Sequence, residues 1–252
     1  MKLFLKIKYN GTNYAGYQVQ NNAPTIQQEL NKATADLFGV KCDITGCSRT
    51  DAGVHALCFC ATVQEHMSDC LNTNIPAERI APALNVRLPN DISVYHAEFV
   101  SSEFHARYDV KSKTYEYRIL NSPHKDPFEV SRAYHFPKYI NDSALLNMKN
   151  AAAAFCGTYD FSAFMAAGSK ITDPIRTIYA CDVIRKGDII TVRITADGFL
   201  YNMVRIICGT LLEVAKGSLS KNDISSIIAS RDRRMAGSTL PPHGLYLVNV
   251  KY

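Results

Sequence analysis

Apolar and polar residues alternate along several short stretches of this chain, with the period of two that is typical of a half-buried β-strand. The first stretch covers residues 2–9, where three apolar residues share one face and three lysines lie on or near the other: Leu3, Leu5 and Ile7 against Lys2, Lys6 and Lys8. The Asn10-Gly11 pair that follows is a turn signal. The pattern therefore predicts a strand that ends at Tyr9.

Similar patterns predict further strands at residues 57–64, 92–99, 115–119 and 245–250, and a hairpin of residues 177–184 and 189–196 around Lys186-Gly187-Asp188. Helical spacing is found elsewhere. Thr25 and Gln28 are placed as a capping box for a helix that runs to about Phe38. Residues 143–155 and 203–214 are also predicted helices, and Gly217 closes the second of them.

Strands that alternate in this way usually form antiparallel sheets with one face covered by helices. We therefore expect an α+β fold rather than a doubly wound parallel sheet. At 252 residues, with 47% apolar and 20% charged residues, the chain is long enough for one large core or two smaller ones. No internal repeat is visible in the residues.

Charge is divided unevenly along the chain. Residues 1–104 hold 8 Lys and Arg and 10 Asp and Glu, whereas residues 105–252 hold 20 and 13. The change coincides with the polar Ser101-Ser102-Glu103 break, so we predict two domains, 1–104 and 105–252. A basic second half suits a phosphate-rich partner, although a solvated surface without any ligand is the commoner meaning of so modest an excess.

The N-terminal segment and the cysteines narrow the class of protein further. The alternating lysines leave no continuous apolar stretch for a signal peptide or membrane span, so we expect a cytoplasmic protein without a membrane partner. The eight cysteines include no Cys-x-x-Cys pair and no His cluster at zinc-ligand spacing. We expect reduced, mostly buried thiols and no metal site.

The run Ser48-Arg49-Thr50-Asp51-Ala52-Gly53-Val54-His55-Ala56-Leu57 is the strongest candidate for chemistry, because it places ionisable groups in a loop directly before a predicted strand. An Asp in such a loop most often bonds its own backbone as a turn residue. Alternatively, Arg49 keeps Asp51 ionised, as a nucleophile or base requires. For His55 we favour a structural role.

Two other features are ambiguous by themselves. Tyr115 and Tyr117 lie on one strand face, where core packing is the default and base stacking the alternative. Arg205 interrupts an otherwise apolar segment, residues 201–207. Either Arg205 pairs with an anion, such as an active-site carboxylate, or it extends to solvent from the helix surface.

Taken together, these residues resemble the TruA-type family of tRNA pseudouridine synthases over nearly the whole chain. The Arg49–His55 string is similar to that family's catalytic loop. Supporting segments follow in the family's order: Tyr9-Asn10-Gly11, Tyr14–Gln18, Thr25-Ile26-Gln27, Leu84-Asn85, Leu88–Ile92, Phe104–Arg107, Tyr115-Glu116-Tyr117, Arg176-Thr177-Ile178, Met203-Val204-Arg205 and Gly244–Leu247.

The resemblance implies two similar α+β domains whose mostly antiparallel sheets form one curved sheet, with helices on the outer face and the active cleft between the domains. It also implies isomerisation of uridine to pseudouridine without a cofactor, in the anticodon stem-loop of tRNA (nucleotides 38 to 40). The enzyme would be a homodimer.

Site residues carry over from the same resemblance. Asp51 would act on the ribose of the flipped-out uridine, as nucleophile or as base. Arg205 would pair with Asp51, Tyr115 would stack on the target base, Arg49 would fill the gap that the base leaves, and Leu245 would line the base pocket.

Three residues depart from the family pattern. Ser48 stands where Gly is frequent, Tyr17 where Trp is frequent, and Val19 where a basic residue is frequent. We therefore expect differences in how residues 14–22 hold RNA, with the chemistry unchanged.

Two other functions compete with this one. A noncatalytic RNA-binding protein would keep the basic half without needing Asp51. A hydrolase of nucleosides or glycosides normally has two acidic groups at the scissile bond, and no second candidate acid is apparent.

Overall fold

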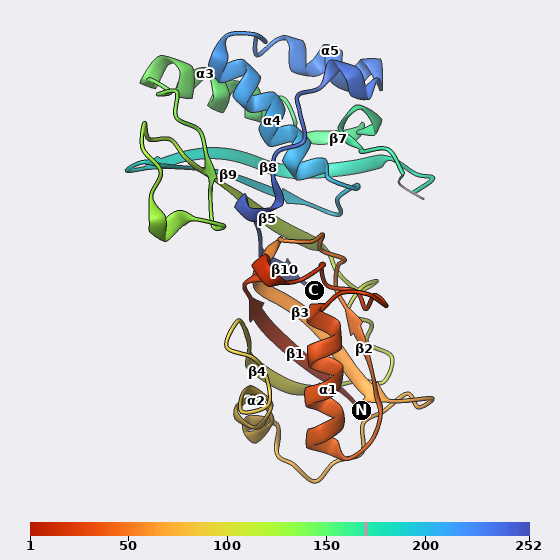
Figure 1. The fold of residues 1–252 in the computed structure, drawn as a ribbon. Helices are drawn as coiled ribbons and strands as arrows, with labels where there is room; N and C mark the ends of the chain where they lie inside the picture. Colours follow the sequence, from red (N-terminus) through yellow and green to blue (C-terminus); the bar gives the residue numbers. More distant parts are fainter. Residues whose placement is uncertain (169–170) are drawn as a thin grey trace. The chain divides into compact units, whose positions relative to one another are not determined.

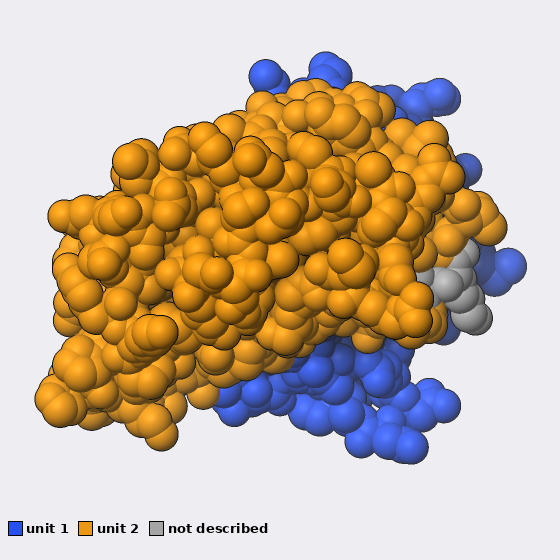
Figure 2. Space-filling view, turned by 90° about the horizontal axis from the view of Figure 1, so that it is seen from above, with its two compact units in different colours: residues 1–111, 246–252 blue, residues 112–245 orange. Residues whose placement is uncertain are grey.

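The computed structural model describes residues 1–168 and 171–252. It divides the chain into two units, shown in ribbon form in Figure 1 and in different colours in Figure 2. Unit 1 contains residues 1–111 and 246–252, and unit 2 contains residues 112–245. Residues 246–252 thus belong to the same unit as residues 1–111, although all of unit 2 lies between them in the sequence.

Unit 1 is a sheet whose strands are ordered β4-β1-β3-β10, with β2 paired to the second half of β3. Figure 1 shows α1 lying across one face of this sheet, and α2 packs against β4. The elements are β1 (Lys2–Tyr9), η1 (Gly11–Asn13), α1 (Ile26–Phe38), β2 (Cys42–Gly46), β3 (His55–Glu65), α2 (Ala77–Asn85), β4 (Ile92–Val100) and β10 (Leu245–Lys251).

Unit 2 is a second sheet, ordered β5-β9-β8-β7, with β6 paired to β5. Helices α3 and α4 pack together, and α3 contacts β8. The elements are β5 (Ser112–Leu120), η2 (Pro127–Glu129), β6 (Tyr134–His135), α3 (Asp142–Ala153), β7 (Gly157–Asp160), η3 (Ser162–Phe164), β8 (Ile175–Lys186), β9 (Ile189–Ala196), α4 (Met203–Lys216), α5 (Asp223–Ser230), η4 (Arg233–Met235) and η5 (Pro242–Gly244).

The α+β class is confirmed. The strand pairings β1–β3, β1–β4, β2–β3, β5–β9, β7–β8 and β8–β9 are antiparallel, whereas β10–β3 and β5–β6 are parallel. The predicted strands and helices all form. Thr25 caps α1 by accepting a hydrogen bond from the Gln28 amide, and α4 ends at Gly217 with φ of 80°.

Several elements were not predicted. Helix α2 contains Pro82, which removes a backbone donor from the helix interior, so its sequence does not read as a helix. Strand β2 has five residues and too few alternations to be recognised. Helix α5 has eight residues and is capped on its C-terminal side by Arg231 in a left-handed conformation instead of by glycine.

The expected thiols are also confirmed. All eight cysteines lie in the described part of the chain, where none forms a disulfide; five are buried, and Cys58, Cys70 and Cys156 are half-buried. Within residues 1–168 and 171–252, no helix combines the length and the apolar character that a bilayer crossing requires.

Helix α4 is held in unit 2 by close backbone packing. A Cβ atom on Gly209 would lie 1.9 Å from the carbonyl oxygen of Ser238. The neighbouring Thr210 hydroxyl accepts a hydrogen bond from the Gly237 amide at 2.9 Å. The segment of residues 237–238 therefore rests directly on the helix backbone.

We expect Gly209→Ala to lower the free energy of unfolding by about 1–3 kcal/mol through overpacking, although alanine favours a helix by about 1 kcal/mol over glycine. Urea unfolding followed by circular dichroism measures the change. Gly39→Ala is the control, because the site has φ of 70° but open space around it, so only the conformational cost of about 1 kcal/mol applies. A Gly209→Ala protein as stable as wild type would contradict this packing.

Candidate active site

The predicted loop position of Asp51 is confirmed. The Asp51 loop, residues 47–54, connects β2 to β3. It begins where the Cys47 amide donates to the Cys60 carbonyl at 2.8 Å and closes in a turn where the Val54 amide donates to the Asp51 carbonyl at 3.2 Å. Gly53 has φ of 76°, which favours glycine at this turn. Asp51 is half-buried and Arg49 is exposed.

The backbone that follows β1 packs directly on this loop. A Cβ on Gly11 would lie 2.0 Å from the Val54 carbonyl oxygen, and one on Gly16 would lie 2.6 Å from the Thr50 carbonyl oxygen. The Tyr17 amide donates to the same Thr50 carbonyl at 3.1 Å. Only residues without a side chain fit at positions 11 and 16, so the two glycines fix where the loop lies.

Buried side chains complete the anchoring. The hydroxyls of Tyr9 and Thr50 are 2.8 Å apart, and both residues are buried. His55 accepts a hydrogen bond from the Gly11 amide at Nδ1, and its ring stacks on Tyr246 at 4.6 Å between centroids. The favoured structural role of His55 agrees with these contacts. Tyr9 was missed as a loop anchor, because its partner Thr50 is 41 residues away.

Tyr17, one of the departures from the family pattern, is buried against Phe59 with ring centroids 4.3 Å apart. Its hydroxyl has no hydrogen-bond partner within the described residues. Burial raises the pKa of Tyr17 well above its usual range. Tyr17 therefore supports the loop as a packing residue.

In unit 2, Tyr115 lies on β5 opposite Ile194 and packs edge-on against Phe199 at 5.0 Å. Tyr115 is 6% exposed. Tyr117, two residues along the same face, is fully buried, and its hydroxyl donates to the Pro241 carbonyl at 2.8 Å. Core packing therefore accounts for Tyr117. Tyr115 is slightly more exposed than Tyr117 and lies nearer the start of β5.

Arg205 lies in the first turn of α4 and is half-buried. Its Nε donates to the Leu240 carbonyl at 2.6 Å, and its Nη1 donates to Asn202 Oδ1. Burial first, and then the charge of Arg205, lowers the pKa of His243. Arg205 is thus a fixed side chain rather than one that extends freely into solvent. Leu245, also in unit 2, is buried at the start of β10.

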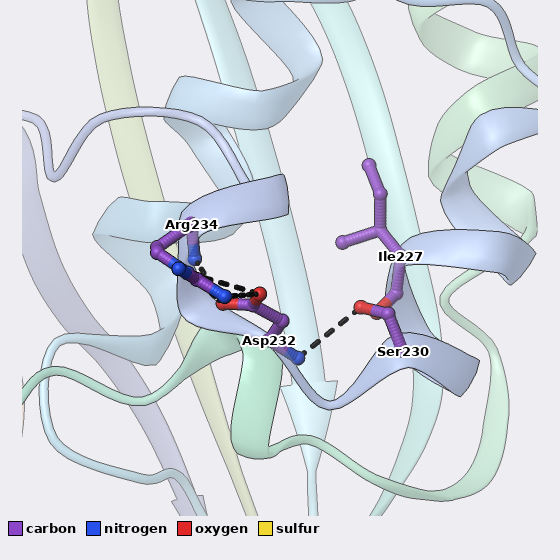
Figure 3. Close-up of polar contacts among 4 residues, drawn as sticks. All are labelled: Ile227, Ser230, Asp232 and Arg234. Carbon is purple, nitrogen blue, oxygen red and sulfur yellow. Dashed lines mark hydrogen bonds and ion pairs between the residues drawn. The ribbon is translucent and has the colours of Figure 1, made fainter.

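The basic residues of unit 2 are partly neutralised within the fold. Figure 3 shows Asp232 bound by the amide and guanidinium of Arg234, and the Asp232 amide donating to Ser230. The Arg234 side chain lowers the pKa of Asp232 to about 2. Arg231 pairs with Asp160 at 3.0 Å. Two of the arginines of unit 2 therefore lie paired with carboxylates of the same unit.

Within the described residues, no group of three or more His, Cys, Asp or Glu side chains is arranged to hold a metal ion.

Comparison with known proteins assigns this chain to a family. A family model described as tRNA pseudouridine synthase matches residues 6–109 and 151–252. The tRNA pseudouridine synthase A of Ruminiclostridium cellulolyticum is 43% identical over 252 residues, covering 100% of this chain and 99% of its own. The tRNA pseudouridine synthase A of Thermoanaerobacter sp. is 44% identical over 250 residues, covering 99% of this chain and 99% of its own. That of Bacillus subtilis is 43% identical over 254 residues, covering 100% of this chain and 99% of its own.

The chain therefore belongs to the tRNA pseudouridine synthase family. It is an isomerase that acts on uridine in tRNA, and tRNA is its macromolecular substrate.

We expect Tyr9→Phe to lower kcat for pseudouridine formation by about fivefold or more with KM for tRNA unchanged, because a buried Thr50 hydroxyl loses its partner at a cost of about 1–3 kcal/mol. Steady-state kinetics on tRNA measures both constants. Tyr252→Phe is the matched control, since it removes a hydroxyl whose hydrogen bonds go to the Ala106 carbonyl at 2.7 Å and to Cys60, neither of which belongs to the loop. Equal kinetics for the two variants would show that the hydroxyl pair does not position the loop.

Proposed function

We propose that this enzyme modifies uridines in the anticodon stem-loop of tRNA, at nucleotides 38 to 40, and that Asp51 is its catalytic carboxylate. The observation that carries the proposal is the Asp51 loop itself, a half-exposed carboxylate with an exposed Arg49 two residues away, held by buried contacts to Thr50 and Val54. A carboxylate that serves only as a turn residue does not require such an anchored loop.

The reaction leaves the atomic composition of the RNA unchanged, because one proton is lost and one is gained. The bond between C1′ of the ribose and N1 of uracil breaks, the base rotates, and a bond forms between C1′ and C5. The proton on C5 is then lost, which restores the C5–C6 double bond, and N1, released from the ribose, gains a proton. Asp51 acts either by attacking C1′ or by removing a ribose proton, and both require an ionised carboxylate beside the sugar.

The other roles follow the family resemblance. In this proposal Arg205 pairs with Asp51 and keeps it ionised, Tyr115 stacks on the target base, and Leu245 lines the base pocket. Arg49, which is exposed, fills the gap left in the RNA stem when the uridine is extruded. We further propose that the enzyme works as a homodimer in the cytoplasm.

We expect Asp51→Asn to abolish tritium release from tRNA labelled at C5 of uridine, a loss of at least about a thousandfold, while tRNA binding stays within about twofold of wild type. Asp43→Asn is the control, because it removes a carboxylate of the same unit that pairs with His66 outside the loop. Undiminished release by Asp51→Asn would refute the catalytic role. Release at uridines outside the anticodon stem-loop alone would refute the proposed site of modification.

For Arg205→Ala we expect the rate to fall far more than tRNA affinity, because in this proposal its partner is Asp51 rather than a phosphate. Arg205→Lys keeps the charge without the two directed contacts to Leu240 and Asn202, and we expect an intermediate rate. Single-turnover kinetics and filter binding separate the two effects. Weaker binding with an unchanged single-turnover rate would assign Arg205 to RNA contact instead.

A further inference from the structure

Three cysteines line up on the face of the unit 1 sheet that lies opposite Leu3, Leu5 and Ile7. Cys60 pairs with Lys6 of β1, whose side chain points away from those three residues. Cys58 lies at an irregularity of the β1–β3 pairing, where Ile7 pairs with Phe59 and Tyr9 with Ala56, and its hydrogen bond with Cys60 brings the two thiols together. Cys47 continues the β2–β3 register to the position opposite Cys60, where its amide donates to the Cys60 carbonyl.

Cys58 is the half-buried member of this row and is surrounded by donors. Its sulfur accepts hydrogen bonds from the Cys60 thiol, the Tyr95 hydroxyl and the Val250 backbone, and Lys6 lies nearby. The Cys60 hydrogen bond is the largest effect, and together these contacts lower the pKa of Cys58 although burial acts in the opposite direction. The site therefore favours a thiolate.

Tyr95 reaches Cys58 because of an irregularity in β4. Lys6 pairs with His96 and Ile7 with Val94, so Tyr95 is an extra residue in the strand. Such bulges re-aim a side chain. The Tyr95 ring is 43% exposed and lies 4.9 Å from Lys8 Nζ. Burial and the hydrogen bond to Cys58 raise the pKa of Tyr95, so its hydroxyl stays a donor to the sulfur.

The remaining ionisable groups around the row add little negative charge. His96, on the same face as Lys6, pairs with Glu98 at 3.3 Å. Tyr252 follows β10, and burial raises its pKa, so it is neutral. The pKa of Cys60 is raised, chiefly because its thiol donates to Cys58, which leaves it protonated. Lys6 is thus the positive charge that acts on the sulfur of Cys58, and Lys8 lies over the ring of its donor Tyr95.

Other cysteines of the chain lie in different surroundings. Burial raises the pKa of Cys181 and of Cys208, and both are within the core of unit 2. Cys70 is half-buried like Cys58, but its contact is the Ser68 hydroxyl at 3.4 Å. It therefore serves as a matched reference.

We propose that Cys58 is a site of reversible oxidation by small hydroperoxides, with Cys60 as the resolving thiol. The Cys58 thiolate attacks one peroxide oxygen, the S–O bond forms as the O–O bond breaks, and the leaving hydroxide takes a proton to become water. Cys60 then attacks the sulfenic sulfur, the S–S bond forms as the S–O bond breaks, and hydroxide leaves with the Cys60 proton as water. Two thiols are oxidised and one hydrogen peroxide is reduced to two waters.

The spacing of the two thiols makes the product easy to reduce. Residues i and i+2 of a strand have Cα atoms about 6.6 Å apart, which is near the upper end of the range that a disulfide spans. Strained disulfides have higher reduction potentials and are the labile ones. The modification is therefore reversible by thiols.

The test treats wild-type protein with hydrogen peroxide and digests it with trypsin and a glutamate-specific protease, which cuts after Glu65 and separates Cys70 from the pair. We expect the peptide with Cys58 and Cys60 to lose two hydrogens and regain them with dithiothreitol. In Cys60→Ser, dimedone should label Cys58. Oxidation of Cys70 at the same rate, or a first dimedone adduct elsewhere, would overturn the proposal.

A second measurement needs no cysteine substitution. At pH 6, iodoacetamide should label Cys58 of the folded wild type at least about tenfold faster than Cys70, because only a thiolate reacts. Tyr95→Phe removes one donor and should reduce this ratio by about threefold or more. Equal labelling of the two cysteines in the wild type, or a ratio unchanged in Tyr95→Phe, would contradict the donor cluster. Neither experiment depends on the role of Asp51.

Discussion

The close approach of two stretches of backbone in unit 1 determines the candidate site. Gly11 and Gly16 bring the segment after β1 within contact of the Val54 and Thr50 carbonyls, where any larger residue would collide. With that distance set, the Tyr9 hydroxyl reaches Thr50 and the Gly11 amide reaches His55. Contacts made by the neighbours of Asp51 therefore set the position of its loop. The residues that make these contacts position the loop without having to contact RNA.

The sequence predicted the regular elements well because their causes are local. Alternation alone located β1, and a capping residue with helical spacing located α1. It did not predict α2, whose helical state depends on packing against β4 and overrides Pro82. Nor did it predict that residues 246–252 join unit 1, because a parallel pairing with β3 across most of the chain leaves no local pattern.

The candidate site was predictable in part for the same reason. Asp51 and Arg49 stand in one contiguous string, so both could be found together. The anchoring of Tyr9 to Thr50 and of Arg205 to Leu240 joins residues 41 and 35 positions apart, and no spacing rule links them. Charge counting includes Asp160 and Asp232, but it does not show that they pair with Arg231 and Arg234.

Unit 1 is built from the two ends of the chain, residues 1–111 and 246–252, and this has a consequence for folding during translation. Its sheet includes β10, which pairs with His55 and Ala56 of β3, yet residues 66–244 are translated between the two strands. Phe4 packs edge-on against Tyr252 at 5.5 Å, so the ends of this unit meet only after both have left the ribosome. Closing so long a loop is entropically costly and slow. While the nascent chain grows, β3 has an open edge that chaperones or other chains can occupy, and the half that carries the Asp51 loop is the one that matures last.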